Sequence, residues 1–132
     1  MASIPKLVDK AVADGMRGMA ITDHGNMIGV KELFNYTNKK NGPIKDEIKG
    51  LNKQIAELEK AEVPDTAAIE ELRNSLKEAK RRLFKPIFGC EMYCARRGKG
   101  QKTDKIDQSG WHLVVLAKNE QGYHNLIKLV SR

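Results

Sequence analysis

The chain has 132 residues, of which 40% are hydrophobic, and it carries a formal net charge of +7. A chain of this length forms one compact domain and buries about two thirds of its unfolded surface, so a second hydrophobic core is not expected. No apolar run approaches the roughly 20 residues that span a bilayer, and no segment has the charge and hydropathy pattern of a signal peptide. These features argue against a membrane protein and predict a cytoplasmic location.

The excess of positive charge lies mostly towards the C-terminus. Residues 1–44 carry 6 basic and 4 acidic side chains, residues 45–84 carry 9 and 9, and residues 85–132 carry 9 and 4. A net charge of this size serves solubility as readily as it serves phosphate binding. It therefore favours a polyanionic partner only weakly.

The first 26 residues predict a helix followed by a buried strand. Ser3 can cap a helix, and Gly15 suits the left-handed conformation that ends one. Residues 19–22 (Met-Ala-Ile-Thr) then run into the turn-forming residues 23–26 (Asp-His-Gly-Asn), as a buried strand ending in a turn would. The apolar side chains of the helix recur at three- and four-residue spacing: Ile4, Leu7, Val8, Ala11 and Val12.

A second helix is expected after this turn, and residues 41–43 (Asn-Gly-Pro) should end it. Its inward-facing side chains are predicted to be Val30, Leu33, Phe34 and Thr37. Apolar residues then recur at heptad spacing on both sides of a break at residues 63–65 (Val-Pro-Asp). Residues 45–84 are therefore predicted to form an antiparallel helical hairpin.

Two local signals support this hairpin. Pro64 cannot continue a helix, while Asp65 or Thr66 can cap the next one. Joining Ile44 directly to Lys85 would give an ordinary short connection from a helix to a strand. The hairpin is therefore interpreted as a coiled-coil-like insertion into a domain made of residues 1–44 and 85–132.

The last part of the chain predicts two strands and a helix. Residues 87–95 and 111–117 are expected to be strands separated by a flexible loop over 96–110, and residues 119–131 a helix capped by Asn119. The order of elements favours an α/β layered fold, with parallel pairing wherever a helix lies between two strands. The two strands joined by the loop can pair differently.

Two cysteines fall within one predicted strand. Cys90 and Cys94 lie four residues apart, so they share a face of the strand at a separation of about 13 Å and cannot easily form a disulfide. They are interpreted as buried free thiols, with a metal or redox role as the alternative.

Asp23 and His24 stand at the carboxyl end of the first predicted strand, the edge where α/β folds collect functional groups. A neutral imidazole binds zinc, manganese or iron, and an adjacent carboxylate can bind the same ion or orient the ring. A capping or turn role for His24 is the alternative.

Three further polar side chains lie in the second half of the chain. Glu91 lies in an otherwise apolar strand, where its charge needs a metal ion, an ion pair with Lys or Arg, or exposure at an edge. His112 begins another apolar run. His124 has no acidic or cysteine neighbour and is interpreted as a surface residue.

Together, Asp23, His24, Glu91 and His112 form a ligand set typical of metals that activate water for attack on a phosphate ester. No standard catalytic nucleophile is evident. The chain has neither a phosphate-binding glycine loop with its lysine nor a Gly-x-Ser-x-Gly motif.

Three segments of the chain carry a family resemblance. They are residues 20–26 (Ala-Ile-Thr-Asp-His-Gly-Asn), 85–93 (Lys-Pro-Ile-Phe-Gly-Cys-Glu-Met-Tyr) and 112–126, which begins His-Leu-Val-Val-Leu-Ala-Lys-Asn-Glu. In this order they resemble the PHP (polymerase and histidinol phosphatase) domain of bacterial DNA polymerase III alpha subunits. The resemblance covers the chain except the hairpin, which looks like a lineage-specific insertion.

The resemblance implies a partial, distorted (β/α)7 barrel with a metal site at the carboxyl ends of its strands. His24, Glu91 and His112 match metal-binding positions of the family, and Asp23 is expected to support them or to act as an additional ligand. The implied metal is zinc, manganese or iron, while magnesium serves a polymerase site elsewhere in such subunits. His112 lies at the start of its predicted strand, not at the carboxyl end where functional groups of α/β folds collect. Its assignment as a ligand therefore depends on the resemblance.

The chain lacks other motifs of the family, including an early His-x-His and a later Asp-x-His, and it lacks the polymerase carboxylates. It is therefore interpreted as an N-terminal fragment that is inactive by itself and whose metal site is incomplete or empty. Its parent is expected to be a DNA-directed DNA polymerase of DNA replication. In some relatives the domain is a proofreading 3′–5′ exonuclease.

The expected partners are DNA and other polymerase III holoenzyme subunits, reached through the parent protein. Two alternatives remain: a free-standing PHP-type metal-dependent phosphoesterase, and an interaction module that acts through the hairpin. A truncated barrel would expose apolar strand edges, so a homodimer of the chain is also predicted.

Overall fold

The structure is a computed structural model that describes residues 3–63, 65–98, 100–101, 103, 105–107 and 109–131. These residues form four α-helices and a three-stranded sheet, so the predicted mixed α/β class is confirmed. The elements in chain order are α1 (Ile4–Ala13), β1 (Gly18–His24), α2 (Gly29–Glu59), α3 (Thr66–Arg82), β2 (Lys85–Cys94), a short 3-10 helix (Lys105–Asp107), β3 (Trp111–Leu116) and α4 (Glu120–Val130). No helix among these residues combines the length and apolar character that crossing a bilayer requires.

The strands lie in the order β1-β2-β3. The Lys85 N–H donates to the Arg17 carbonyl where both strands begin, and just beyond the end of β1 the Gly25 N–H donates to the Glu91 carbonyl of β2, each over 2.9 Å. β1 and β2 therefore run parallel, as expected for strands separated by helices. β2 and β3 are antiparallel, with Cys94 opposite Trp111, so the strands joined by the loop do pair differently.

The chain divides into two compact units, which are described separately. One comprises Met1–Gly18 and Asn35–Lys85, and the other comprises Met19–Phe34 and Pro86–Arg132. The first contains α1, most of α2, and α3. The second contains most of the sheet, the start of α2, and α4.

α2 does not end where the sequence predicted. The expected stop at residues 41–43 is wrong, because the helix continues through Pro43 as far as Glu59. An interior proline removes one helical hydrogen bond and costs about 3 kcal/mol. The buried Asn41 side chain offsets part of this cost by donating to the Phe84 carbonyl (2.8 Å) and accepting from the Phe84 N–H (3.0 Å).

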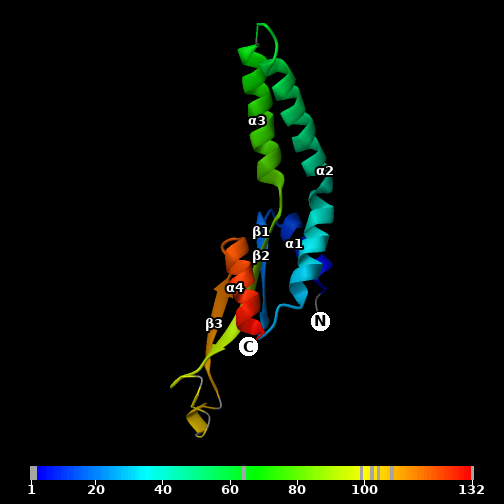
Figure 1. Cartoon of the computed structure of the whole chain (residues 1–132). Coiled ribbons are helices and arrows are strands. Elements are labelled where there is room, and N and C mark those ends of the chain that lie inside the picture. Colours follow the sequence, from blue (N-terminus) through cyan, green and yellow to red (C-terminus); the bar gives the residue numbers. More distant parts are fainter. Residues whose placement is uncertain are drawn as a thin grey trace. The chain divides into compact units, whose positions relative to one another are not determined.

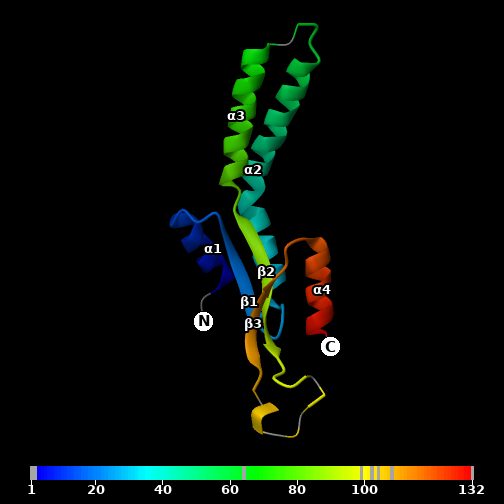
Figure 2. The ribbon, with the colours of Figure 1, turned by 90° about the vertical axis from the view of Figure 1, so that its left-hand side faces the viewer.

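The second half of α2 and the whole of α3 run side by side in opposite directions (Figures 1 and 2). Ile55 and Ile69 are buried, and Arg73 pairs with Glu59 over 2.8 Å. Asp65 caps α3 as predicted, its Oδ1 accepting from two backbone N–H groups at 3.1 Å. Pro64, expected to separate the two helices, lies outside the described residues.

Asp9 of α1 joins two side chains of α2. The Lys40 ammonium lies 2.7 Å from its Oδ1, and the Tyr36 hydroxyl donates to the same carboxylate over 2.8 Å. These contacts lower the pKa of Asp9, with Lys40 as the larger cause, and they raise the pKa of Lys40 and of Tyr36. Ser3 precedes α1 but its side chain makes no capping bond, and Gly15 has the expected left-handed φ of 76°.

The second unit packs helices on one face of its sheet. The Phe88 ring of β2 lies between Phe34 of α2, at 6.3 Å, and Tyr123 of α4, at 5.9 Å between centroids. Asn119 caps α4 by accepting from the Gly122 N–H, as predicted. The fully buried side chains of this unit include Leu33, Leu126 and Cys90.

Both cysteines are free, but only Cys90 is buried. The expectation that both would be buried is wrong for Cys94, because that residue closes β2 next to the loop and is exposed.

Candidate metal centre

Three polar side chains meet at one edge of the sheet. His24 is the last residue of β1, Glu91 lies near the end of β2, and His112 is the second residue of β3. Because β3 is antiparallel to β2, its beginning lies beside the end of β2, with His112 opposite Tyr93. His112 therefore reaches the edge that the ends of β1 and β2 share.

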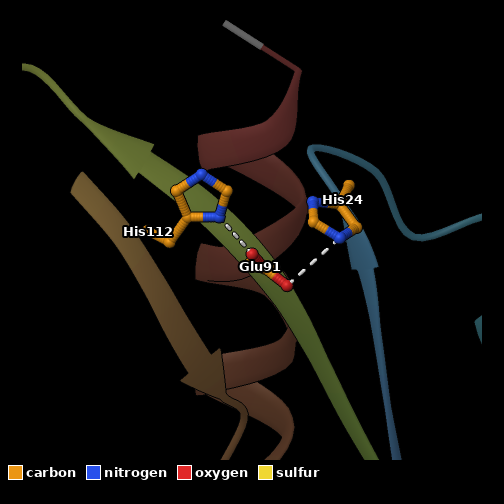
Figure 3. A group of neighbouring side chains, drawn as sticks. All are labelled: His24, Glu91 and His112. Atoms are coloured by element: carbon orange, nitrogen blue, oxygen red, sulfur yellow. Dashed lines mark hydrogen bonds and ion pairs between the residues drawn. The ribbon is translucent and has the colours of Figure 1, made fainter. Parts of the chain in front are cut away.

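The three side chains also project from one face of the sheet. Residues directly opposite each other on antiparallel strands point to the same face, so His112 shares its face with Tyr93 and, two residues earlier, with Glu91. Figure 3 shows the three side chains turned towards one another. Phe88 points to the other face, where it contacts Tyr123 of α4.

Glu91 stands between the two imidazoles. Its Oε2 lies 3.4 Å from His24 Nε2, and its Oε1 is hydrogen-bonded to His112 Nδ1 (Figure 3). One donor atom from each residue lies within 4.8 Å of the others. Zinc ligands at about 2.0–2.2 Å from one ion lie roughly 3.3 Å apart in a tetrahedron, so modest side-chain rotations bring these atoms to bonding distance.

The site is half open. The Glu91 side chain is 20% exposed, whereas those of His24 and His112 are 63% and 57% exposed. The mostly covered Glu91 carboxylate thus has two imidazoles as its neighbours, and within the described residues no lysine or arginine forms an ion pair with it. The exposed imidazoles leave room for a further ligand on the solvent side.

Asp23 lies elsewhere. Adjacent residues of a strand point to opposite faces, and its carboxylate turns away from His24 to accept from the Gly29 N–H at 3.0 Å. It satisfies a backbone donor at the start of α2. The group whose donor atoms converge consists of His24, Glu91 and His112.

Comparison with known sequences identifies the family. The profile of the PHP domain matches residues 1–132, the whole chain. The chain belongs to the PHP domain family. This agrees with the resemblance carried by the three segments quoted above.

The PHP domain of this chain is similar to part of several DNA polymerase III alpha subunits. That of Borreliella burgdorferi is 30% identical over 131 residues, which cover 98% of the chain and 8% of the relative. Those of Treponema pallidum and Chlamydia pneumoniae are 29% and 28% identical over 132 residues, or 99% of the chain, and 8% and 7% of the relatives. The chain thus spans less than a tenth of the length of these relatives.

Sequence reasoning missed Tyr93. Its hydroxyl lies 3.2 Å from His24 Nδ1, and its ring lies 4.6 Å from that of His112 between centroids. The contact with Nδ1 leaves the Nε2 of His24 turned towards Glu91. The signal was available, because Tyr93 follows Glu91 by two residues and must share its face of the strand.

His124 is not part of this group of side chains. It lies in α4 with its ring 58% exposed and its Nε2 3.9 Å from Glu120. Its surface position agrees with the sequence interpretation. It therefore offers a natural control for the two histidines at the sheet edge.

Proposed function

We propose that the chain is part of the PHP domain of a replicative DNA polymerase alpha subunit, and that His24, Glu91 and His112 hold one divalent metal ion in it. The observation that carries this proposal is the convergence of two imidazoles and one carboxylate, from three strands, within 4.8 Å. Two nitrogen ligands and one oxygen ligand suit borderline ions such as zinc, manganese or iron(II).

The three residues have separable roles in this proposal. His24 and His112 supply nitrogen ligands, and Glu91 supplies the negative charge that lowers the net charge of the complex. Tyr93 orients the His24 ring through Nδ1, the kind of outer contact that metal-binding histidines usually have. A divalent ion bound here supplies Lewis acidity and a more acidic water for attack on a phosphate ester.

We further propose that the sheet belongs to a PHP-type distorted (β/α)7 barrel, into which residues 45–84 are inserted. Val114 and Leu116 lie on the same face as Glu91 and are 54% and 50% exposed. A closed barrel turns this face inwards and buries those side chains. The insertion is supported by the balanced charge of residues 45–84, which suits a solvated arm.

Metal binding tests the proposal directly. Dialysis of the metal-free chain against Zn²⁺ or Mn²⁺, followed by elemental analysis, should give one equivalent of ion per chain. Binding should weaken on acidification, because protons compete for the imidazole nitrogens. A chain that retains no ion at micromolar Zn²⁺ would contradict the proposed metal site.

DNA and the other polymerase subunits are proposed to meet this domain through the longer polypeptide. The chain alone should show no turnover of a nucleotide ester or of single-stranded DNA with Mn²⁺ or Zn²⁺, because three ligands are only part of the family's set. A spectrophotometric phosphoesterase assay and a gel assay measure this. Turnover that His24→Ala abolishes would favour a free-standing phosphoesterase instead.

The exposed edge of β3 should also drive self-association. Leu113 is 49% exposed and Trp111 62% exposed on this strand, and unpaired edge strands readily pair with another chain. Light scattering should therefore give a mass above the 14.8 kDa of one chain. Leu113→Lys should restore the monomer mass, whereas Leu129→Lys on α4 should not; a monomeric starting protein would contradict this expectation.

A further inference from the structure

A second charged feature lies in the first unit, on α3. Its lining consists almost entirely of cationic side chains around a shallow cavity of about 370 Å³. We call it the basic groove and define it by Arg17, Arg73, Leu76, Lys77, Lys80, Arg81 and Lys85. It shares no residue with the metal centre.

The basic groove is assembled from three separate parts of the chain. Arg73, Lys77 and Lys80 recur at four- and three-residue spacing, which places them on one side of α3. Arg17 precedes β1 and Lys85 begins β2, and the Lys85 N–H donates to the Arg17 carbonyl at 2.9 Å. This joins Arg17 to the segment that directly follows α3.

Gly18 makes that close approach possible. A Cβ atom at this position would lie 2.4 Å from the Lys85 carbonyl oxygen and 3.2 Å from the Lys85 Cβ. Any side chain would force the two backbone segments apart. The chain therefore has a glycine at the one place where Arg17 and Lys85 come together.

Much of this positive charge is not neutralised locally. Arg73 pairs with Glu59 and Arg81 with Glu78. Within the described residues, no ion pair or side-chain hydrogen bond involves the other four cations, which are all exposed: Arg17, Lys77, Lys80 and Lys85. Four uncompensated cations around one hollow form a site for a polyanion.

The positive surface is also bounded. The adjoining hollow of α3 is lined by three cations, Lys77, Arg81 and Arg82, as well as by Glu47, Glu71 and Glu78, so its charges are balanced. The lining of the basic groove, in contrast, includes no carboxylate, although residues 45–84 carry equal numbers of acidic and basic side chains. Regional net charge concealed this separation in the sequence.

Helix stability explains only part of the cluster. Cations in the last turn of a helix interact favourably with its dipole, which accounts for Lys80 and Arg81. The effect falls off within one turn, so it does not account for Arg73 and Lys77. The dipole of α3 also does not account for Arg17, because Arg17 lies outside that helix.

We propose that the basic groove binds the phosphate backbone of a DNA strand without reading its sequence. From Arg73 to Arg81 the helix rises about 12 Å, which is long enough for the groove to face more than one phosphate of a strand. The choice of DNA over other polyanions rests on the proposed function in a replicative polymerase. The arrangement of the cations around the groove does not depend on that proposed function.

Anisotropy of a fluorescein-labelled oligodeoxythymidine, titrated with the whole chain at several salt concentrations, tests this inference. Lys77→Glu with Lys80→Glu should weaken binding by about tenfold or more. Losing two phosphate contacts should also lower the slope of log affinity against log salt by about 1.4 for a single strand. The milder Lys77→Gln with Lys80→Gln should act in the same direction.

The matched control is Lys49→Glu with Lys53→Glu on α2. These lysines are 81% and 79% exposed, lie outside the groove, and give the same change in net charge. An equal loss of affinity in this control would show that only net charge matters and would overturn the groove. So would undetectable binding of the unchanged chain at low salt.

A third arm separates this inference from the metal site. His24→Ala should bind DNA as the unchanged chain does, because His24 does not line the groove. If the chain binds no metal ion but the Lys77 and Lys80 variants still lose affinity for DNA, only the proposed metal site is contradicted. Loss of DNA binding in His24→Ala would contradict a separate groove.

Discussion

His24→Ala and His112→Ala should each lower the affinity of the chain for Zn²⁺ by at least about 100-fold. Removing an outer partner of a metal ligand costs 10- to 100-fold, and the loss of one of three ligands should cost no less. Glu91→Gln should act similarly, because it removes the charge while keeping the shape. Isothermal titration calorimetry, with a competing chelator where binding is tight, measures these constants.

His124→Ala is the matched control, since it removes an imidazole of similar exposure from outside the cluster. Its affinity for Zn²⁺ should equal that of the unchanged chain. Tyr93→Phe should show an intermediate loss of about tenfold, because it frees the His24 ring without removing a ligand. Equal losses in His124→Ala and His24→Ala would show nonspecific binding to surface histidines.

The same variants distinguish a metal site from a merely hydrogen-bonded triad. An ion at 100 times its dissociation constant stabilises the folded chain by about 2.7 kcal/mol. The unchanged chain should therefore melt at a higher temperature with Zn²⁺ than without it, and His112→Ala should show no such shift. A triad held only by hydrogen bonds would give no Zn²⁺-dependent shift in either protein.

The helices and strands around the candidate metal centre could be predicted from the sequence because local residue patterns specify them. The apolar run before Asp23 and His24, the apolar strand around Glu91, and the cap at Asn119 all correspond to observed elements. Local composition was enough for these inferences.

The position of His112 could not be derived in the same way. Whether the first residues of a strand reach the functional edge depends on the direction in which that strand pairs, and the loop before β3 permits either direction. Antiparallel pairing, with Tyr93 opposite His112, places the imidazole beside Glu91. The pairing direction of β3, which the residue order does not specify, thus determines the position of His112.

The end of α2 could not be predicted from the sequence either, because residues 41–43 have the composition of a segment that ends a helix. The partner that keeps Asn41 in the helix is the backbone of Phe84, 43 residues away. A local stop signal was therefore outweighed by a long-range pair of hydrogen bonds and by the packing of α2 with α3. No short window of sequence contains that information.

Asn41→Ala should accordingly lower the free energy of unfolding by about 2–4 kcal/mol. Two hydrogen bonds at about 1 kcal/mol each set the lower figure, and the buried Phe84 N–H and carbonyl that lose their partner raise the cost towards the upper figure. The better helix propensity of alanine offsets only a few tenths of this. Urea denaturation followed by circular dichroism measures the change.

The control is Asn35→Ala, at an exposed asparagine that precedes Asn41 in the same helix. It has the same gain in propensity but no buried bond to lose, so its stability should stay within about 0.5 kcal/mol of the starting protein. If both variants behaved alike, the continuation of α2 past Pro43 would not depend on Asn41. The helix would then be maintained by its packing with α3 alone, and Ile55→Ala should be the more damaging change.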